Sequence, residues 1–202
     1  MSANKKKLAS NSLNSSAVWK NWHFYLLFLI LSFVFYGSTL NNKYSMDDDL
    51  VTSTYEYPTE DVEDRILVSP HRNVEKGIAG IPAIFTSHYA VNSKQSYEYR
   101  PIVTSVFAIE YQFFGSSPMV SHCINILFYA LVVILMFRFI RIAMPRSKIG
   151  LAFAIALLFL IHPLHSEVVN NIKSRDEILC LIFGITALIH LLKFFDTKKI
   201  LW

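Results

Sequence analysis

The chain has 202 residues, of which 53% are hydrophobic and 14% aromatic, and its formal net charge is +4. Apolar residues at this level, gathered into long runs, exclude an ordinary soluble domain and indicate an all-α protein that crosses a membrane several times. The basic residues stand beside the apolar runs and are not interleaved with aromatic residues, so they favour membrane topology over a nucleic-acid partner. The lipid bilayer is therefore the first partner that we expect.

The first membrane span is predicted at Trp22 to Leu40, after a polar tail. Residues 1–18 are rich in Ser, Asn and Lys with little to bury, which predicts a disordered cytoplasmic tail. The apolar run that follows has aromatic residues near both ends and reaches the roughly 20 residues that a bilayer requires. We expect a membrane domain at residues 19–196, with spans at about 22–40, 119–137, 149–161 and 178–195, and a short cytoplasmic end at 197–202.

A long polar region, residues 41–118, separates the first two spans and is predicted to carry two interfacial helices. Connections of this length usually hold function or helices of their own. Between Gly77 and Tyr89, apolar residues recur at helical spacing after an early proline, as in an amphipathic helix on a membrane surface. The second helix is expected to begin at Pro101, since proline suits a first turn, and to end at Gly115.

The sequence allows two routes between the last two spans. The predicted third span, residues 149–161, is shorter than usual, and Pro163 follows it. A re-entrant hairpin is one alternative, but it would bury the many ionisable groups between His162 and Glu177 at high cost. Two spans joined by an aqueous external loop at residues 162–177 are preferred, which gives four transmembrane helices in all.

The distribution of lysine and arginine predicts the orientation of these spans. One side of the membrane receives the following basic residues: Lys5, Lys6, Lys7, Lys20, Arg138, Arg141, Arg146, Lys148, Lys193, Lys198 and Lys199. By the positive-inside rule this side is the cytoplasm, so both termini are expected there. Loops 41–118 and 162–177 then share the opposite side, which is the periplasm of a bacterium or the lumen of a eukaryotic organelle.

Three adjacent carboxylates, Asp47, Asp48 and Asp49, follow the first span and are called the acidic motif below. Like charges this close favour protonation of one of them unless cations lie nearby, which suits a general base or a cation site. The alternative is a solvated turn that caps a short interfacial helix, because aspartate is a favoured N-cap residue. The residues alone leave both interpretations open.

Arg100 and Arg175 are candidates for binding a phosphate group on the same side of the membrane. The planar guanidinium group grips phosphate with paired hydrogen bonds and stabilises the charge of a leaving phosphate. Each arginine has an alternative role. Arg100 would extend toward lipid headgroups from an interfacial position, and Arg175 would pair with its neighbours Asp176 or Glu177.

A histidine-containing run adds further polar candidates. His162, His165 and Glu167 resemble a metal-ligand set by type, but a proline interrupts them and their spacing differs from the His-Glu-x-x-His arrangement. A divalent metal is thus a minor alternative, and no cofactor is expected. On the second span, His122 and Asn125 share a helix face, where packing against a neighbouring helix is favoured over a role in a site.

Several short motifs, taken in order along the chain, carry a resemblance to a known family. They are Asp47-Asp48-Asp49, Glu75-Lys76-Gly77-Ile78, Tyr99-Arg100-Pro101, Phe114-Gly115, Ser121-His122, His162-Pro163-Leu164-His165-Ser166-Glu167 and Ser174-Arg175-Asp176-Glu177. From Trp22 to Phe195, the chain resembles the N-terminal part of the membrane glycosyltransferases of the GT-C fold. The likeness is closest to bacterial relatives of the transmembrane and tetratricopeptide-repeat O-mannosyltransferases, which are of the protein mannosyltransferase type.

The resemblance implies transfer of a sugar from a polyprenyl-phosphate donor to a hydroxyl of an acceptor protein or glycan at the non-cytoplasmic face. It also implies a place in the bacterial inner membrane. The family's catalytic acid lies in the first external loop, where it falls on Asp47 or Asp48 as the general base. The remaining candidates are expected to bind substrate: Asp49, Arg100, His162, His165, Glu167 and Arg175.

The family's proteins have many more spans than four, so the chain is expected to form a partial GT-C-like fold that is inactive alone. A second function class stays open, a non-catalytic membrane anchor or assembly subunit that binds a partner through its external loop. A transporter is less favoured, because no charged residue lies in the middle of a predicted span and ion pathways usually need one.

Overall fold

The structure is a computed structural model that describes residues 21–45, 48, 73–88, 90–91, 96–97 and 99–197. The predicted tail at residues 1–18, the aspartates Asp47 and Asp49, and residues 198–202 lie outside this part of the chain. The regular elements of the described residues are helices, apart from one antiparallel pair of two-residue strands, β1 (Ala90–Val91) and β2 (Ser96–Tyr97). The all-α prediction is thus confirmed for the parts that carry the spans.

Three segments are long and apolar enough to cross a membrane, by length and composition: Trp22–Asn41, Pro118–Ala143 and Arg175–Phe195. They comprise helix α3 (Trp22–Tyr36) with the 3-10 helix η1 (Gly37–Asn41), helix α8 (Pro118–Ala143) and most of helix α11 (Arg175–Thr197). Three of the four predicted spans are therefore confirmed as apolar helices of sufficient length, as expected of a multi-pass membrane protein.

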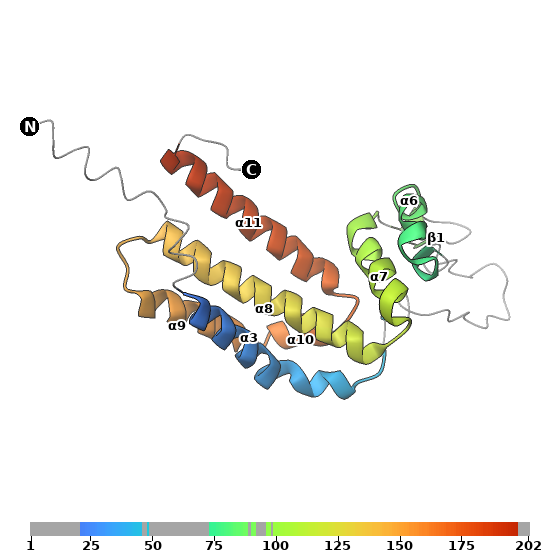
Figure 1. The fold of residues 1–202 in the computed structure, drawn as a ribbon, viewed down its shortest axis with the longest axis horizontal. Helices are drawn as coiled ribbons and strands as arrows, with labels where there is room; N and C mark the ends of the chain where they lie inside the picture. Colours follow the sequence, from blue (N-terminus) through green and yellow to red (C-terminus); the bar gives the residue numbers. More distant parts are fainter. Residues whose placement is uncertain are drawn as a thin grey trace, which may run out of the picture.

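Helix α8 forms the axis of the bundle, with α3 and α9 (Ile149–Leu160) on one side and α11 on the other (Figure 1). Helix α3 runs antiparallel to α8, because Phe24 lies 5.5 Å from Phe137 near the end of α8, whereas Tyr36 lies 5.2 Å from Tyr129 nearer its start, between ring centroids. Aromatic and aliphatic side chains from these three helices form the largest buried core.

Helix α11 runs parallel to α8 (Figure 1). Arg175 at the start of α11 bonds to Ser121 in the first turn of α8, and the buried residues that follow pack along the rest of α8. Because α8 and α11 are parallel, the chain that connects them must run back from the end of α8 to its start. Residues 144–174 therefore retrace the length of α8.

This return path is a broken helix. Helix α9 has 12 residues, which span about 18 Å at 1.5 Å per residue and are too few to cross a bilayer as one helix. After a break at residues 161–164, the short helix α10 (His165–Asn170) continues toward the start of α8. There the Asn125 Nδ2 group donates to the Asn171 carbonyl at 3.1 Å.

The external loop predicted at residues 162–177 stays a prediction: α10 and the residues after it lie against α8, while His162, Glu167 and Glu177 in this stretch are exposed. The prediction rested on the cost of burying ionisable groups here. Of these groups, Arg175 is fully buried and pairs with Glu110, while Asp176 pairs with Arg100. Paired and hydrogen-bonded groups lose much less on burial than isolated ones.

The described helices of the long polar region form a cap next to the start of α8 (Figure 1). Its main element is helix α7 (Pro101–Phe114), which begins at a proline and ends at Gly115, whose φ of +63° favours glycine. The helix predicted between Gly77 and Tyr89 is shorter than expected, with the 3-10 helix η4 (Gly77–Gly80) followed by α6 (Ile81–Ile84). Both pack on α7, while Ile102, Ile109 and Phe113 of α7 remain exposed, consistent with an interfacial element.

Candidate functional site

A fully buried arginine lies where α7, α8 and α11 meet. The Arg175 side chain is 0% exposed, and its Nη1 group donates to Glu110 Oε2 at 2.6 Å. Its Nε group donates to Asn125 Oδ1 at 2.7 Å, and its Nη2 group donates to the Ser121 carbonyl at 3.0 Å. The guanidinium carbon also lies 4.1 Å from the centroid of the Phe107 ring. These five residues are called the Arg175 cluster below.

Helices α7 and α8 supply three kinds of partner to this cation. Glu110 on α7 supplies the opposite charge, Asn125 on α8 supplies a neutral acceptor, and Phe107 supplies an aromatic face that attracts cations. A buried arginine without such partners would be strongly destabilising. The arrangement therefore fixes the first turn of α11 against the other two helices.

The substrate-binding role predicted for Arg175 stays a prediction, because its guanidinium is occupied by protein groups in this structure. The alternative pairing with the adjacent Asp176 or Glu177 is not what the structure describes, since the acidic partner is Glu110. Asn125 was expected to pack against a neighbouring helix through a hydrogen bond rather than to serve a site. It bonds to Arg175 of the neighbouring helix α11 and to the Asn171 carbonyl, and His122 is buried beside it on α8.

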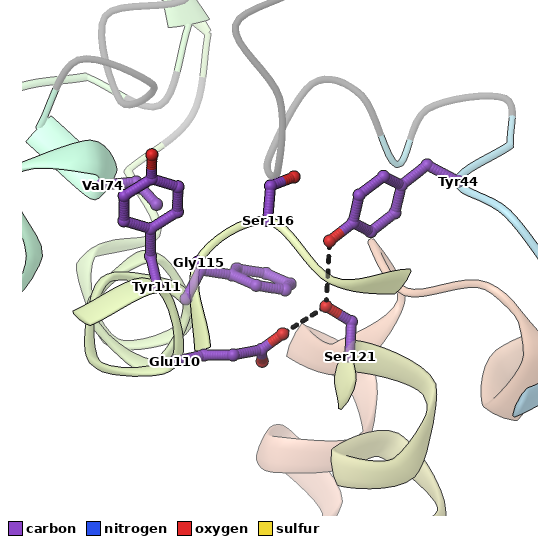
Figure 2. Close-up of a pocket in the computed structure, with 8 residues that line it drawn as sticks. Tyr44, Val74, Glu110, Tyr111, Gly115, Ser116 and Ser121 are labelled. Carbon is purple, nitrogen blue, oxygen red and sulfur yellow. Dashed lines mark hydrogen bonds between the residues drawn. The ribbon is translucent and has the colours of Figure 1, made fainter. Parts of the chain in front are cut away.

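A polar chain leads from Glu110 through Ser121 to Tyr44, which follows η1 in the chain (Figure 2). Ser121 Oγ donates to Glu110 Oε1, and the Tyr44 hydroxyl lies 3.4 Å from Ser121 Oγ. Burial raises the pKa of Tyr44, so this phenol stays protonated at neutral pH. Because the single Ser121 proton is directed at Glu110, the Tyr44 hydroxyl acts as donor to Ser121.

The polar chain borders a small pocket, shown in Figure 2. Its lining residues are Tyr44, Val74, Phe107, Glu110, Tyr111, Gly115, Ser116 and Ser121. The cavity volume is about 10 Å³, far below the roughly 300 Å³ at which small-molecule sites begin. This space holds about one water molecule and no part of a lipid-linked sugar.

Asp48 is the one residue of the acidic motif within the described part of the chain. It is 0% exposed. Its Oδ1 atom accepts the Lys173 backbone N–H at 2.9 Å, and its Oδ2 atom accepts the Ser45 backbone N–H at 3.1 Å. Asp48 is therefore buried and held by main-chain donors, unlike the solvated turn of the alternative prediction.

Asp48 belongs to the same electrostatic environment as the Arg175 cluster. Its charge acts on Arg175 and on the buried His122. Lys173, which holds the Asp48 carboxylate, is two residues from Arg175 in the chain. The structure thus brings two predicted site residues, Asp48 and Arg175, to the same end of the bundle.

Arg100 reaches the same end from the N-cap position of α7. It forms an ion pair with Asp176, the residue after Arg175, and its side chain is 32% exposed. This pairing does not match simple extension toward lipid headgroups. Among the predicted arginines, Arg100 is the more accessible to a bound phosphate.

The histidine-containing run lies farther along α8, near Tyr129. His165 Nδ1 is 2.8 Å from the Tyr129 hydroxyl and 2.8 Å from the Phe159 carbonyl. His165 therefore provides a hydrogen-bond partner for the backbone at the break between α9 and α10. His162 and Glu167 are exposed. No group of three or more His, Cys, Asp or Glu side chains in the described ranges is arranged to hold a metal ion.

Sequence reasoning missed Glu110, which completes the Arg175 cluster. A signal was present, since Glu110 is the sole charged residue between Pro101 and Phe114. A lone carboxylate within an amphipathic helix indicates a buried partner of opposite charge. Tyr44 and Phe107 gave no comparable signal, because an aromatic residue beside a membrane span is common.

The chain is similar in sequence to curated animal proteins that carry the name protein O-mannosyl-transferase. The chain is 27% identical over 165 residues to protein O-mannosyl-transferase F38B6.6 of Caenorhabditis elegans, across 81% of the chain and 22% of that relative. It is 35% identical over 86 residues to TMTC1 of Homo sapiens, across 42% of the chain and 10% of that relative. TMTC3 of Mus musculus is 30% identical over 95 residues, across 47% of the chain and 10% of the relative.

The chain thus spans less than a quarter of the length of these relatives. No family model and no solved structure matches it. The three relatives come from animals, so they give no support to the predicted bacterial membrane. Their names agree with the glycosyltransferase class that the motif resemblance implied.

Proposed function

We propose that the chain belongs to a membrane glycosyltransferase that moves a sugar, mannose by analogy with its relatives, from a polyprenyl-phosphate donor to an acceptor hydroxyl. The observation that carries this proposal is the position of Asp48. A carboxylate of the acidic motif is fixed by main-chain donors beside the Arg175 cluster, at the end of the bundle where Arg100 is accessible. A carboxylate at this place can act as the general base, and an arginine beside it can stabilise the negative charge of a leaving phosphate group.

The proposed reaction needs one general base and one group that stabilises phosphate. Asp47 or Asp48 accepts the proton of the acceptor hydroxyl while the hydroxyl oxygen forms a bond to the anomeric carbon of the sugar. The bond from that carbon to the phosphate oxygen breaks, and the polyprenyl phosphate leaves with the electron pair. Attack opposite the leaving group inverts the configuration at the anomeric carbon, as in inverting glycosidases.

Arg100 is the residue proposed to stabilise the leaving phosphate. Its partial exposure allows a guanidinium–phosphate contact, with Asp176 holding the side chain in place before the donor binds. His162, His165, Glu167 and Asp49 remain proposed substrate contacts. Arg175 contributes its positive charge from a buried position beside Glu110.

The proposed topology has four crossings, with the cytoplasm at the end of α8. The parallel arrangement of α8 and α11 supports a complete return through the membrane, made by α9, the break and α10 together. Arg138, Arg141, Arg146 and Lys148 cluster at the turn between α8 and α9, which the positive-inside rule assigns to the cytoplasm. Asp48 and the Arg175 cluster then lie toward the non-cytoplasmic face, which in an animal cell is the lumen.

Transfer of labelled mannose tests the proposal directly. Membranes containing the full-length protein are expected to transfer mannose from a polyprenyl-phosphate donor to acceptor protein, and the double variant Asp47→Asn with Asp48→Asn is expected to lose this transfer. Full transfer by the double variant would contradict the proposed base. If the wild-type protein binds a partner but transfers no mannose, the alternative function as a membrane anchor or assembly subunit is favoured.

A further inference from the structure

Resting on the proposed function, we infer that Asp48 is a positioning residue that fastens the acidic motif to the start of α11 and does not itself take the proton. A general base must come within about 3 Å of the hydroxyl that it deprotonates. The Asp48 carboxylate is fully buried, and each of its oxygens accepts a main-chain N–H. Such a carboxylate is placed to hold the chain rather than to meet an acceptor.

The Lys173 backbone N–H donates to Asp48 and lies in a turn that the Asn125 side chain holds at both ends. Asn125 Nδ2 donates to the Asn171 carbonyl at 3.1 Å, while Asn125 Oδ1 accepts from Arg175 Nε at 2.7 Å. Lys173 lies midway between these two attachment points, and its N–H is shared between Asp48 Oδ1 at 2.9 Å and Asn171 Oδ1 at 3.0 Å. The Asn125 amide therefore fixes the turn at residues 171–175 and, through it, the position of the Lys173 N–H group.

Three residues at or just before the start of α11 hold other parts of the protein. Lys173 holds Asp48 through its backbone, Arg175 holds Glu110 on α7, and Asp176 holds Arg100 at the start of α7. The acidic motif and the proposed phosphate-binding arginine are thus fixed to the same short segment. The backbone at residues 173–176 sets the distance between the acidic motif and Arg100. A substitution at Asn125 or Lys173 that moves this backbone therefore displaces both of them.

A pH profile distinguishes positioning from proton transfer. In the full-length protein, Asp47→Asn should reduce turnover by about 10² to 10⁴ and abolish the fall in rate on the acidic side of the profile, because the base is gone. Asp48→Asn should reduce turnover by only about tenfold to a hundredfold, the effect of weakened charge-assisted hydrogen bonds. It should keep the acidic fall in rate, because the base is still present.

A matched pair at Lys173 tests the backbone contact separately from the side chain. Lys173→Pro and Lys173→Ala both remove the lysine side chain, but only proline removes the N–H that Asp48 accepts. Turnover of Lys173→Pro should fall at least tenfold below that of Lys173→Ala, with an unchanged KM for the donor. Asn125→Leu, which removes both attachments of the turn, should lower turnover in the same way and provides a second variant if the proline variant does not fold.

The outcomes separate the two proposals. If Asp48→Asn abolishes the acidic fall in rate while Asp47→Asn keeps it, Asp48 is the base and the positioning role is overturned, whereas the proposed function stands. Equal turnover of Lys173→Pro and Lys173→Ala, with Asn125→Leu as active as wild type, also overturns the positioning role. If both aspartate variants and their double variant transfer sugar at the wild-type rate, the proposed function itself fails.

Discussion

The Tyr36 hydroxyl donates a hydrogen bond to the Leu160 carbonyl at 2.9 Å, across 124 residues of sequence. The Tyr129 hydroxyl also reaches this carbonyl at 3.2 Å, and it lies 3.0 Å from the Phe159 carbonyl and 2.8 Å from His165 Nδ1. Leu160 is the last residue of α9, so its carbonyl has no partner further along that helix. Two tyrosines from neighbouring helices thus allow the return path to break inside the bundle, where an unsatisfied carbonyl would be costly.

Removing both hydroxyls should destabilise this break. Because each tyrosine still leaves the other as donor, Tyr36→Phe or Tyr129→Phe alone should lower the free energy of unfolding by less than about 1 kcal/mol, and the double variant by about 2 kcal/mol or more. Thermal unfolding in detergent measures the difference. Tyr25→Phe, another tyrosine of α3, serves as a control for the loss of one hydroxyl. Simple additivity of two small effects would contradict shared satisfaction of Leu160.

The two ion pairs between α7 and α11 should differ in their contribution to stability. Glu110 and Arg175 are buried, so Glu110→Leu alone leaves an uncompensated buried cation and should cost about 3 to 5 kcal/mol. The double variant Glu110→Leu with Arg175→Met should recover most of this loss. Arg100 and Asp176 are partly exposed, and Asp176→Asn should cost about 1 kcal/mol or less.

Unfolding of the wild type and these three variants in detergent provides the comparison. The expected order of stability places the Asp176 variant nearest the wild type and the Glu110 single variant lowest. A double variant at Glu110 and Arg175 that is no more stable than the Glu110 single variant would contradict a buried charge pair as the source of the loss.

The long helices could be predicted from sequence because the length of an apolar run is a local property, and α3, α8 and α11 follow from it. Their ends were less predictable. Helix α8 extends to Ala143, beyond the predicted end at residue 137, because Arg138 and Arg141 fit within the helix, with Arg141 Nη1 donating to the Ser147 carbonyl at 3.3 Å. Long arginine side chains reach polar groups without ending a helix.

The candidate site could be predicted by residue type but not by partner. Asp48 and Arg175 were identified as polar residues at one end of the spans, yet their partners are 125 and 65 residues away in sequence, at Lys173 and Glu110. A backbone N–H carries no residue identity, so its contact with Asp48 leaves no trace in the sequence. Nearby acids beside Arg175 suggested local pairing, whereas the fold brings Glu110 to it.

Cysteine labelling tests the four-crossing topology. In a background without Cys123 and Cys180, Ser147→Cys between α8 and α9 should react with a membrane-impermeant reagent from the cytoplasmic side. Ser87→Cys in the cap and Ser174→Cys before α11 should react from the opposite side, because residues 149–174 return along the whole of α8. Reaction of Ser147→Cys and Ser174→Cys from the same side would show that the broken helix does not complete a crossing.

The Tyr44 phenol should make stability depend on pH in the alkaline range. Burial raises the pKa of Tyr44 in the folded protein, while the unfolded chain releases this proton at about pH 10. Above that pH the folded state binds more protons than the unfolded state, so the free energy of unfolding falls as pH rises. The stability difference between wild type and Tyr44→Phe should therefore stay constant from about pH 7 to 9 and shift against the wild type above about pH 10, measured by thermal unfolding in detergent. A difference that stays the same up to about pH 11 would show that the Tyr44 hydroxyl is not held in its neutral form beside Ser121 and Glu110.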